Sequence, residues 1–90
     1  MILFAGALIA ETTPLVGLLS NVKIRSKRLV HGSYKGRDIA ILTTGVGSQK
    51  AFSRTREVLQ SLPIVQVVSF GTCGSLSDSF SMGQVFHLYL

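Results

Sequence analysis

Two apolar runs on either side of one amphipathic segment restrict the possible folds of this chain most strongly. Ile39–Leu42 is apolar without alternation, as expected of a strand that is buried on both faces, and Ile64–Val68 is a largely apolar run that stops at a loop of small residues, as expected of a buried strand. Between them, Ser48–Leu62 carries its apolar residues on one stripe, starts at a potential cap, Ser48, and stops before Pro63. This strand–helix–strand order predicts a parallel pair of strands joined by a right-handed crossover.

Similar signals predict the remaining elements. Ile2–Gly6 is a short apolar strand, and Thr13 followed by Pro14 predicts a helix that begins there and runs to about Ser20. Turn residues between further β-prone runs predict additional strands at residues 22–24, 28–34, 38–43 and 85–90. We therefore expect a three-layer α/β/α fold around a mixed, largely parallel sheet. Two helices are few for covering both faces of such a sheet.

The composition indicates part of a larger domain in a reducing compartment. The 90 residues are 47% hydrophobic and 14% charged, which is an apolar balance for a chain with so much surface relative to its volume. Cys73 is the single cysteine, so no internal disulfide can form and we predict a cytoplasmic protein. The apolar start, Met1–Leu8, has no basic flank and is soon followed by Glu11, so we predict a core strand and no signal peptide or membrane span.

A net charge of +5 raises the question of nucleic-acid binding. The charges in Lys23–Lys27 alternate along a predicted strand, which is typical of a solvated edge strand. Aromatic residues for base stacking are not interleaved with them. We predict no nucleic-acid partner, with a phosphate-binding patch as the alternative.

Three predicted strand ends carry the candidate chemistry. The first leads to Glu11, the second to the turn Thr43–Ser48, and the third to Gly71-Thr72-Cys73-Gly74. A carboxylate near a hydroxyl can hold and deprotonate water, and glycine-rich turns offer backbone N–H groups to a sugar, a phosphate or a carboxylate. Each signal is weak by itself. Glu11 could instead stabilise a helix start, the Thr72 hydroxyl could cap a loop, and Cys73 could be a small packing residue.

In this order the three ends resemble one family. The chain contains, in sequence, Gly6-Ala7-Leu8-Ile9-Ala10-Glu11, Thr44-Gly45-Val46-Gly47, Phe70-Gly71-Thr72-Cys73-Gly74-Ser75-Leu76 and Met82-Gly83-Gln84-Val85. This pattern is similar to that of the nucleoside phosphorylase/nucleosidase superfamily. It is closest to the branch of methylthioadenosine/S-adenosylhomocysteine nucleosidases and futalosine-hydrolase-like enzymes. The resemblance extends from Ile2 to Phe86.

The resemblance implies cleavage of the N-glycosidic bond of a purine nucleoside, without a cofactor or a metal. It implies that Glu11 and Thr72 hold the attacking water from its two sides. It also implies a substrate-binding set around the ribose, its 5′ substituent and the base, formed by Ala7, Leu8, Val46, Gly47, Gly71, Cys73 and Gly74. Nucleosidases of this branch are usually dimeric, so a homodimer is implied for the complete form.

Two departures from the family pattern modify this expectation. Ser69 stands where phosphorolytic members with a similar loop have a phosphate-binding arginine, and Ala5-Gly6-Ala7 replaces their Gly-Asp-Pro loop. We therefore predict water as the nucleophile, with a phosphorolytic relative as the alternative. The family is more than twice as long, and residues 1–90 correspond to the N-terminal portion of its single domain. The catalytic aspartate belongs to the other portion, which leaves a non-catalytic nucleoside-binding fragment as a further alternative.

Overall fold

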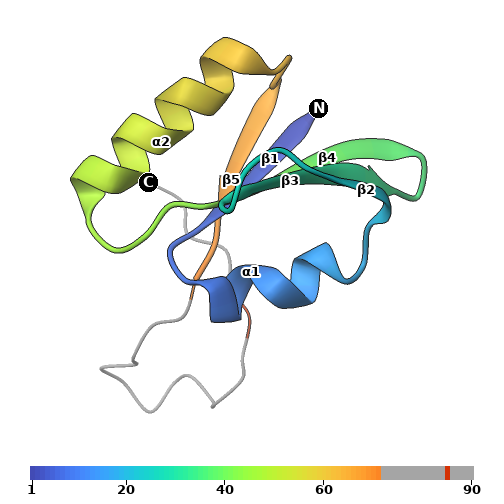
Figure 1. Ribbon diagram of the computed structural model, residues 1–90, viewed down its shortest axis with the longest axis horizontal. Coiled ribbons are helices and arrows are strands. Elements are labelled where there is room, and N and C mark those ends of the chain that lie inside the picture. Colours follow the sequence, from blue (N-terminus) through green and yellow to red (C-terminus); the bar gives the residue numbers. More distant parts are fainter. Residues whose placement is uncertain (72–84, 86–90) are drawn as a thin grey trace.

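The computed structural model describes residues 1–71 and residue 85, and in that part of the chain it contains five strands and two helices (Figure 1). In chain order they are β1 (Ile2–Gly6), α1 (Ile9–Val16), β2 (Ser20–Ile24), β3 (Leu29–Tyr34), β4 (Arg37–Thr43), α2 (Ser48–Ser61) and β5 (Gln66–Ser69). The strand predicted at residues 85–90 lies outside the described residues, except for Val85. No helix within the described ranges has both the length and the apolar character needed to cross a membrane.

The five strands form one mixed sheet in the order β2-β3-β4-β1-β5. β1 lies in parallel between β4 and β5, with Ile2 opposite both Ile39 and Gln66. The β2–β3 and β3–β4 pairs are antiparallel. The predicted crossover is confirmed, because α2 connects β4 to β5, two strands that both run parallel to β1.

The two helices cover opposite faces of the sheet (Figure 1). On one face, Val58 of α2 forms the buried core with Leu3, Ala40 and Leu42. Register places these three strand residues on the same side, whereas side chains at neighbouring positions point to the other side. On that second face the buried Thr12 of α1 meets Thr43, with 2.8 Å between their hydroxyl oxygens. The predicted layered α/β fold is therefore confirmed.

The turn between β3 and β4 fixes the register of the hairpin. Lys35 and Gly36 have φ values of 50° and 79°, and they connect the paired residues Tyr34 and Arg37. Two consecutive left-handed residues make a tight turn whose twist suits antiparallel strands, and glycine takes the second position without steric cost. The turn predicted at Lys35–Arg37 is confirmed.

The start of α1 differs from its prediction. The helix begins at Ile9, so Thr13 and Pro14 lie inside it and the helix ends before Ser20. A carboxylate replaces the expected threonine cap, because the backbone N–H of Leu8 donates to Glu11 Oε1 at 3.1 Å. This is the glutamate half of a capping box, which stabilises the first turn. The Thr13 hydroxyl instead donates to the carbonyl of Ile9 at 2.8 Å.

The start of α2 also differs in its cap. Ser48 is the first helical residue and Gly47, with φ of 109°, occupies the cap position without a side-chain hydrogen bond.

The strand β2 lies at the edge of the sheet beside β3, and it is exposed along its whole length. This confirms a solvated edge strand at Lys23 and Ile24, whereas Arg25, Ser26 and Lys27 lie beyond β2, in the connection to β3.

Candidate functional site

The carboxyl ends of β4, β1 and β5 meet at one edge of the sheet, where backbone hydrogen bonds continue the pairing into the loops. Thr44 N–H donates to the Gly6 carbonyl at 2.8 Å, and Gly45 N–H donates to the Ala7 carbonyl at 3.0 Å. On the other side, Phe70 N–H donates to the Ala5 carbonyl at 3.0 Å. In open parallel sheets this edge is where ligands bind. The predicted meeting of three strand ends is thus present.

Glu11 follows β1, and it lies where the ends of β1 and β5 meet. One carboxylate oxygen accepts the Leu8 N–H, and a Cβ added at Gly71 would lie 3.2 Å from the other, Oε2. Gly71 therefore lets the segment after β5 approach the carboxylate closely. The Glu11 side chain is partly buried, so its charge sits at the rim of the site rather than in open solvent.

A pocket of about 350 Å³, which we call the strand-end pocket, opens beside these strand ends, towards α2. It includes Ala7 and Gly47, whereas Leu8 and Val46 are 47% and 69% exposed and lie outside its lining. The complete lining is formed by Ala5, Gly6, Ala7, Thr44, Gly45, Gly47, Ser48, Ala51, Thr55, Val67, Ser69 and Phe70. The structure thus groups two of the predicted residues in the pocket, and Glu11 with Gly71 beside it.

The pocket contains polar residues that were not predicted. Ser48 and Thr55 come from one face of the first turns of α2, a face that the 3.6-residue period of that helix could have indicated. Thr44 is only 4% exposed, and its hydroxyl donates to the Gly45 carbonyl at 2.9 Å. That hydroxyl therefore stabilises the turn that carries Gly45 and Gly47.

Arg54 supports the same turn from α2. Its Nη1 donates to the Thr44 carbonyl, and a Cβ added at Gly45 would lie 2.8 Å from Nη1. Gly45 has φ of 81°, so its backbone favours glycine, and a Cβ at this position would also require the guanidinium of Arg54 to shift. The guanidinium thus packs directly over the turn.

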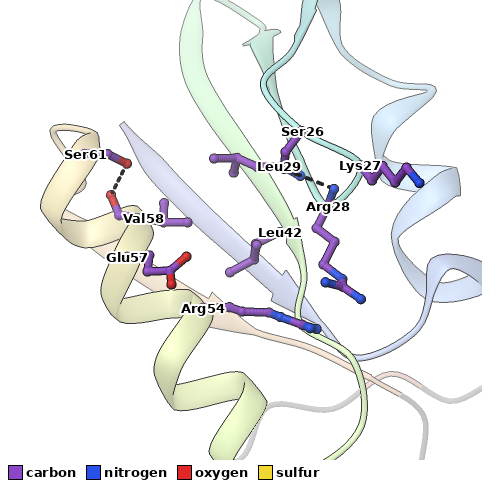
Figure 2. A pocket seen from close by; sticks show the side chains of 9 residues that line it. All are labelled: Ser26, Lys27, Arg28, Leu29, Leu42, Arg54, Glu57, Val58 and Ser61. Carbon is purple, nitrogen blue, oxygen red and sulfur yellow. Dashed lines mark hydrogen bonds between the residues drawn. The ribbon is translucent and has the colours of Figure 1, made fainter.

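Arg54 also borders a second cavity, of about 410 Å³, on the α2 face of the sheet (Figure 2). We call it the α2–hairpin cavity because it lies between α2 and the start of the β3–β4 hairpin. Its lining is formed by Ser26, Lys27, Arg28, Leu29, Leu42, Arg54, Glu57, Val58 and Ser61. The family resemblance assigned no function to these residues.

Three of the predicted site residues, Thr72, Cys73 and Gly74, lie outside the described residues. Their placement relative to Glu11 therefore stays a prediction. Within the described ranges, the structure does not bring together three His, Cys, Asp or Glu side chains that could hold a metal ion.

Sequence comparison relates the chain to two kinds of enzyme. The family model of the phosphorylase superfamily matches residues 4–86. A DeoD-type purine nucleoside phosphorylase of Buchnera aphidicola is 32% identical over 71 residues, which cover 74% of this chain and 30% of the relative. A 5′-methylthioadenosine/S-adenosylhomocysteine nucleosidase of Shewanella denitrificans is 26% identical over 83 residues, or 89% of this chain and 36% of the relative. The chain therefore spans about a third of these relatives.

Two solved structures of nucleosidases of the same kind have a similar fold. The Streptococcus pneumoniae enzyme with a transition-state inhibitor superposes with a TM-score of 0.81 at 15% identity, covering 91% of this chain and 37% of that one. The Neisseria meningitidis enzyme with methylthio-immucillin-A gives a TM-score of 0.79 at 22% identity, covering 89% and 36%. These likenesses agree with the mixed sheet and the two helices described above. The chain belongs to the phosphorylase superfamily.

Proposed function

We propose that this chain supplies the ribose and water side of a site that hydrolyses the N-glycosidic bond of a purine nucleoside. The observation that carries the proposal is the Glu11 carboxylate, which is held by the Leu8 N–H and approached by Gly71 at the carboxyl edge of the sheet. The nucleoside would be of the methylthioadenosine, S-adenosylhomocysteine or futalosine type. Nucleosidases solved with adenine and with methylthio-immucillin-A share the fold, which supports this class of ligand.

The chemistry of the bond explains why a fixed carboxylate is useful there. Glycosidic cleavage passes through a transition state with oxocarbenium character, so positive charge develops on the ribose. In the proposed mechanism, Glu11 stabilises this charge and accepts a proton from the attacking water, with the Thr72 hydroxyl on the other side of that water. Ala7, Leu8, Val46, Gly47, Gly71, Cys73 and Gly74 would bind the ribose, its 5′ substituent and the base.

Ser69 favours water over phosphate as the nucleophile. It lines the strand-end pocket at the position where the family resemblance expects a phosphate-binding arginine in phosphorolytic members. A phosphate dianion needs several charge-assisted donors, and serine offers a neutral hydroxyl. Phosphorolysis remains the second candidate because the Buchnera phosphorylase is 32% identical to this chain.

We also propose that residues 1–90 correspond to the N-terminal portion of one domain. The relatives are about three times as long as the matched segment. In this proposal the purine pocket and the aspartate that protonates the leaving base belong to the other portion, and the complete form is a homodimer. A chain acting alone as a nucleoside-binding module is the non-enzymatic alternative.

A chimaera tests the proposal directly. This chain would replace the matched segment, 36% of the length, of the Shewanella nucleosidase. Adenine release from methylthioadenosine would then be measured by absorbance with and without inorganic phosphate. We expect release at the same rate in both conditions. A rate that requires phosphate would instead support phosphorolysis, and binding of methylthioadenosine without adenine release would support the nucleoside-binding alternative.

Replacing Glu11 with glutamine in that chimaera isolates the charge of the carboxylate. The glutamine amide would retain an oxygen for the Leu8 N–H, so α1 should remain capped. We expect adenine release to fall by a factor of about 10²–10⁴, as for loss of a general base. Asp38→Asn is the matched control, because Asp38 is an exposed carboxylate in the β3–β4 hairpin. Equal activity of the Glu11→Gln variant and this control would show that the Glu11 carboxylate does not activate the water.

A further inference from the structure

We propose that the α2–hairpin cavity binds a small ligand that combines an oxyanion, carboxylate or phosphate, with an apolar body. The cavity is separate from the strand-end pocket, since the two share no lining residue. The proposal therefore stands independently of the nucleosidase proposal. It rests on the charges of the lining, on the anchoring of two arginines and on the apolar floor between them.

Cationic side chains outnumber acidic ones around the cavity. Lys27, Arg28 and Arg54 line it, and Glu57 is its one carboxylate. In the described part of the chain, neither arginine forms an ion pair with a carboxylate. Two guanidinium groups without an acidic partner create a positive potential in a concave, partly apolar site, and such a site attracts an anion.

Both arginines are anchored at the end of the same strand. Arg54 Nη1 donates to the Thr44 carbonyl immediately after β4. The Arg28 carbonyl accepts the Thr43 N–H at 2.8 Å, which fixes the backbone of Arg28 at that end of β4. Figure 2 shows that the two guanidinium groups extend to the same end of the cavity, away from Ser61. A planar oxyanion between them could accept N–H groups from both, because each guanidinium has donors beyond the one that Arg54 already uses.

The rest of the lining defines the body of the ligand. Leu29, Leu42 and Val58 make an apolar floor next to the arginines, and the half-buried Leu29 presents most of its surface because Leu42 and Val58 are only 3% and 4% exposed. The Ser26 hydroxyl accepts hydrogen bonds from the N–H groups of Arg28 and Leu29, each at 3.2 Å. These bonds fix the backbone of the loop that carries Arg28. An aromatic or branched aliphatic acid matches this combination of an apolar floor and a cationic rim better than a bare anion does.

Three probes titrated into the 90-residue chain test both parts of the proposal. Benzoate carries the oxyanion and the ring, benzamide has the same shape without the charge, and inorganic phosphate has the charge without the ring. Amide chemical shifts of Leu29, Leu42 and Val58 report occupancy. We expect benzoate to bind about tenfold or more tightly than benzamide, since charge-assisted hydrogen bonds favour the anion. Equal affinity for benzoate and benzamide would overturn the oxyanion site, and phosphate binding as tightly as benzoate would overturn the part played by the apolar floor.

Two substitutions with opposite expected effects locate the site. Arg28→Gln removes one proposed donor from an exposed side chain, and benzoate binding should weaken by about tenfold to a hundredfold. Glu57→Gln removes the one carboxylate of the lining, so benzoate binding should become tighter. Arg37→Gln is the matched control. This substitution removes the same charge at the far end of the hairpin, outside the cavity lining, so it should leave the affinity for benzoate unaltered. Circular dichroism checks folding, and a similar loss of affinity in the Arg28 and Arg37 variants would show that the anion responds only to net charge.

Discussion

Two glycines of this chain have nearly the same backbone conformation in very different surroundings. Gly36 and Gly45 have φ values of 79° and 81°. A Cβ added at Gly36 would meet no atom within 4 Å, whereas at Gly45 it would approach Arg54 Nη1 to 2.8 Å. The first glycine is needed for its backbone alone, and the second also makes room for the guanidinium that holds the Thr44 carbonyl.

Alanine at each position separates these two requirements. Gly36→Ala should cost about 1–2 kcal/mol, from the left-handed backbone alone. Gly45→Ala should cost about 1 kcal/mol more, because Arg54 must move and give up its hydrogen bond to Thr44. Urea unfolding of the two variants measures the difference. Equal destabilisation would mean that Arg54 does not hold the turn.

The residue scale also shows what sequence patterns could and could not predict about the site. That Gly45 and Gly47 belong to a turn beside a ligand pocket follows from glycines placed after an apolar strand. That Val46 points to solvent does not follow, because its direction depends on the left-handed glycines on either side of it. The contact between Glu11 and Gly71 joins residues far apart in the sequence, and the strand order had to be known before it could be derived.

At the scale of elements, a partly buried hydroxyl pair connects α1 to the sheet. Thr12 is 3% exposed, and its hydroxyl lies 2.8 Å from that of Thr43 on β4. Because α1 also carries Glu11, this pair helps to fix the position of the proposed water-binding carboxylate. Helix and site are therefore coupled through the face of the sheet opposite α2.

A double-mutant cycle measures that coupling. Thr12→Val should destabilise the chain by about 1 kcal/mol, because it leaves the Thr43 hydroxyl without this partner. Thr43→Val should cost less, because the Thr12 hydroxyl also donates to the Ile9 carbonyl at 3.3 Å. The double variant should lose less than the sum of the two, since no hydroxyl is then left behind. Chemical denaturation of the four proteins gives the interaction energy. Strict additivity would indicate that the two hydroxyls do not stabilise each other.

Element types followed from the sequence more reliably than element boundaries. The amphipathic stripe of α2 predicted that helix nearly to its ends, because Pro63 is a strong stop signal. The start of α1 was misplaced, since Thr13 and Pro14 form a plausible start that competes with the one made by Glu11. Which of two local signals wins depends on packing: only the earlier start puts Thr12 against Thr43.

At the scale of the whole molecule, a small core holds the sheet and α2 together. Leu3 on β1 is fully buried among Ala40, Leu42 and Val58. Truncating it to alanine should cost about 2–5 kcal/mol, a large share of the about 5–15 kcal/mol that stabilises a typical domain. Ile24→Ala, at a side chain that is 77% exposed on β2, should change little. Thermal unfolding followed by circular dichroism compares them, and similar midpoints for the two variants would contradict this description of the core.

The position of β1 between β4 and β5 has a consequence for the order in which the chain can fold. β1 precedes both of its partners in the chain, so it forms no pair until β4 exists, and its second partner, β5, comes later still. Pairs that are distant in sequence form slowly, whereas the β2–β3–β4 meander needs only short turns. During translation the meander would therefore form first, and β1 would insert beside β4 afterwards. Until then, its apolar residues Ile2–Ala5 are the segment of the nascent chain that most needs protection from aggregation.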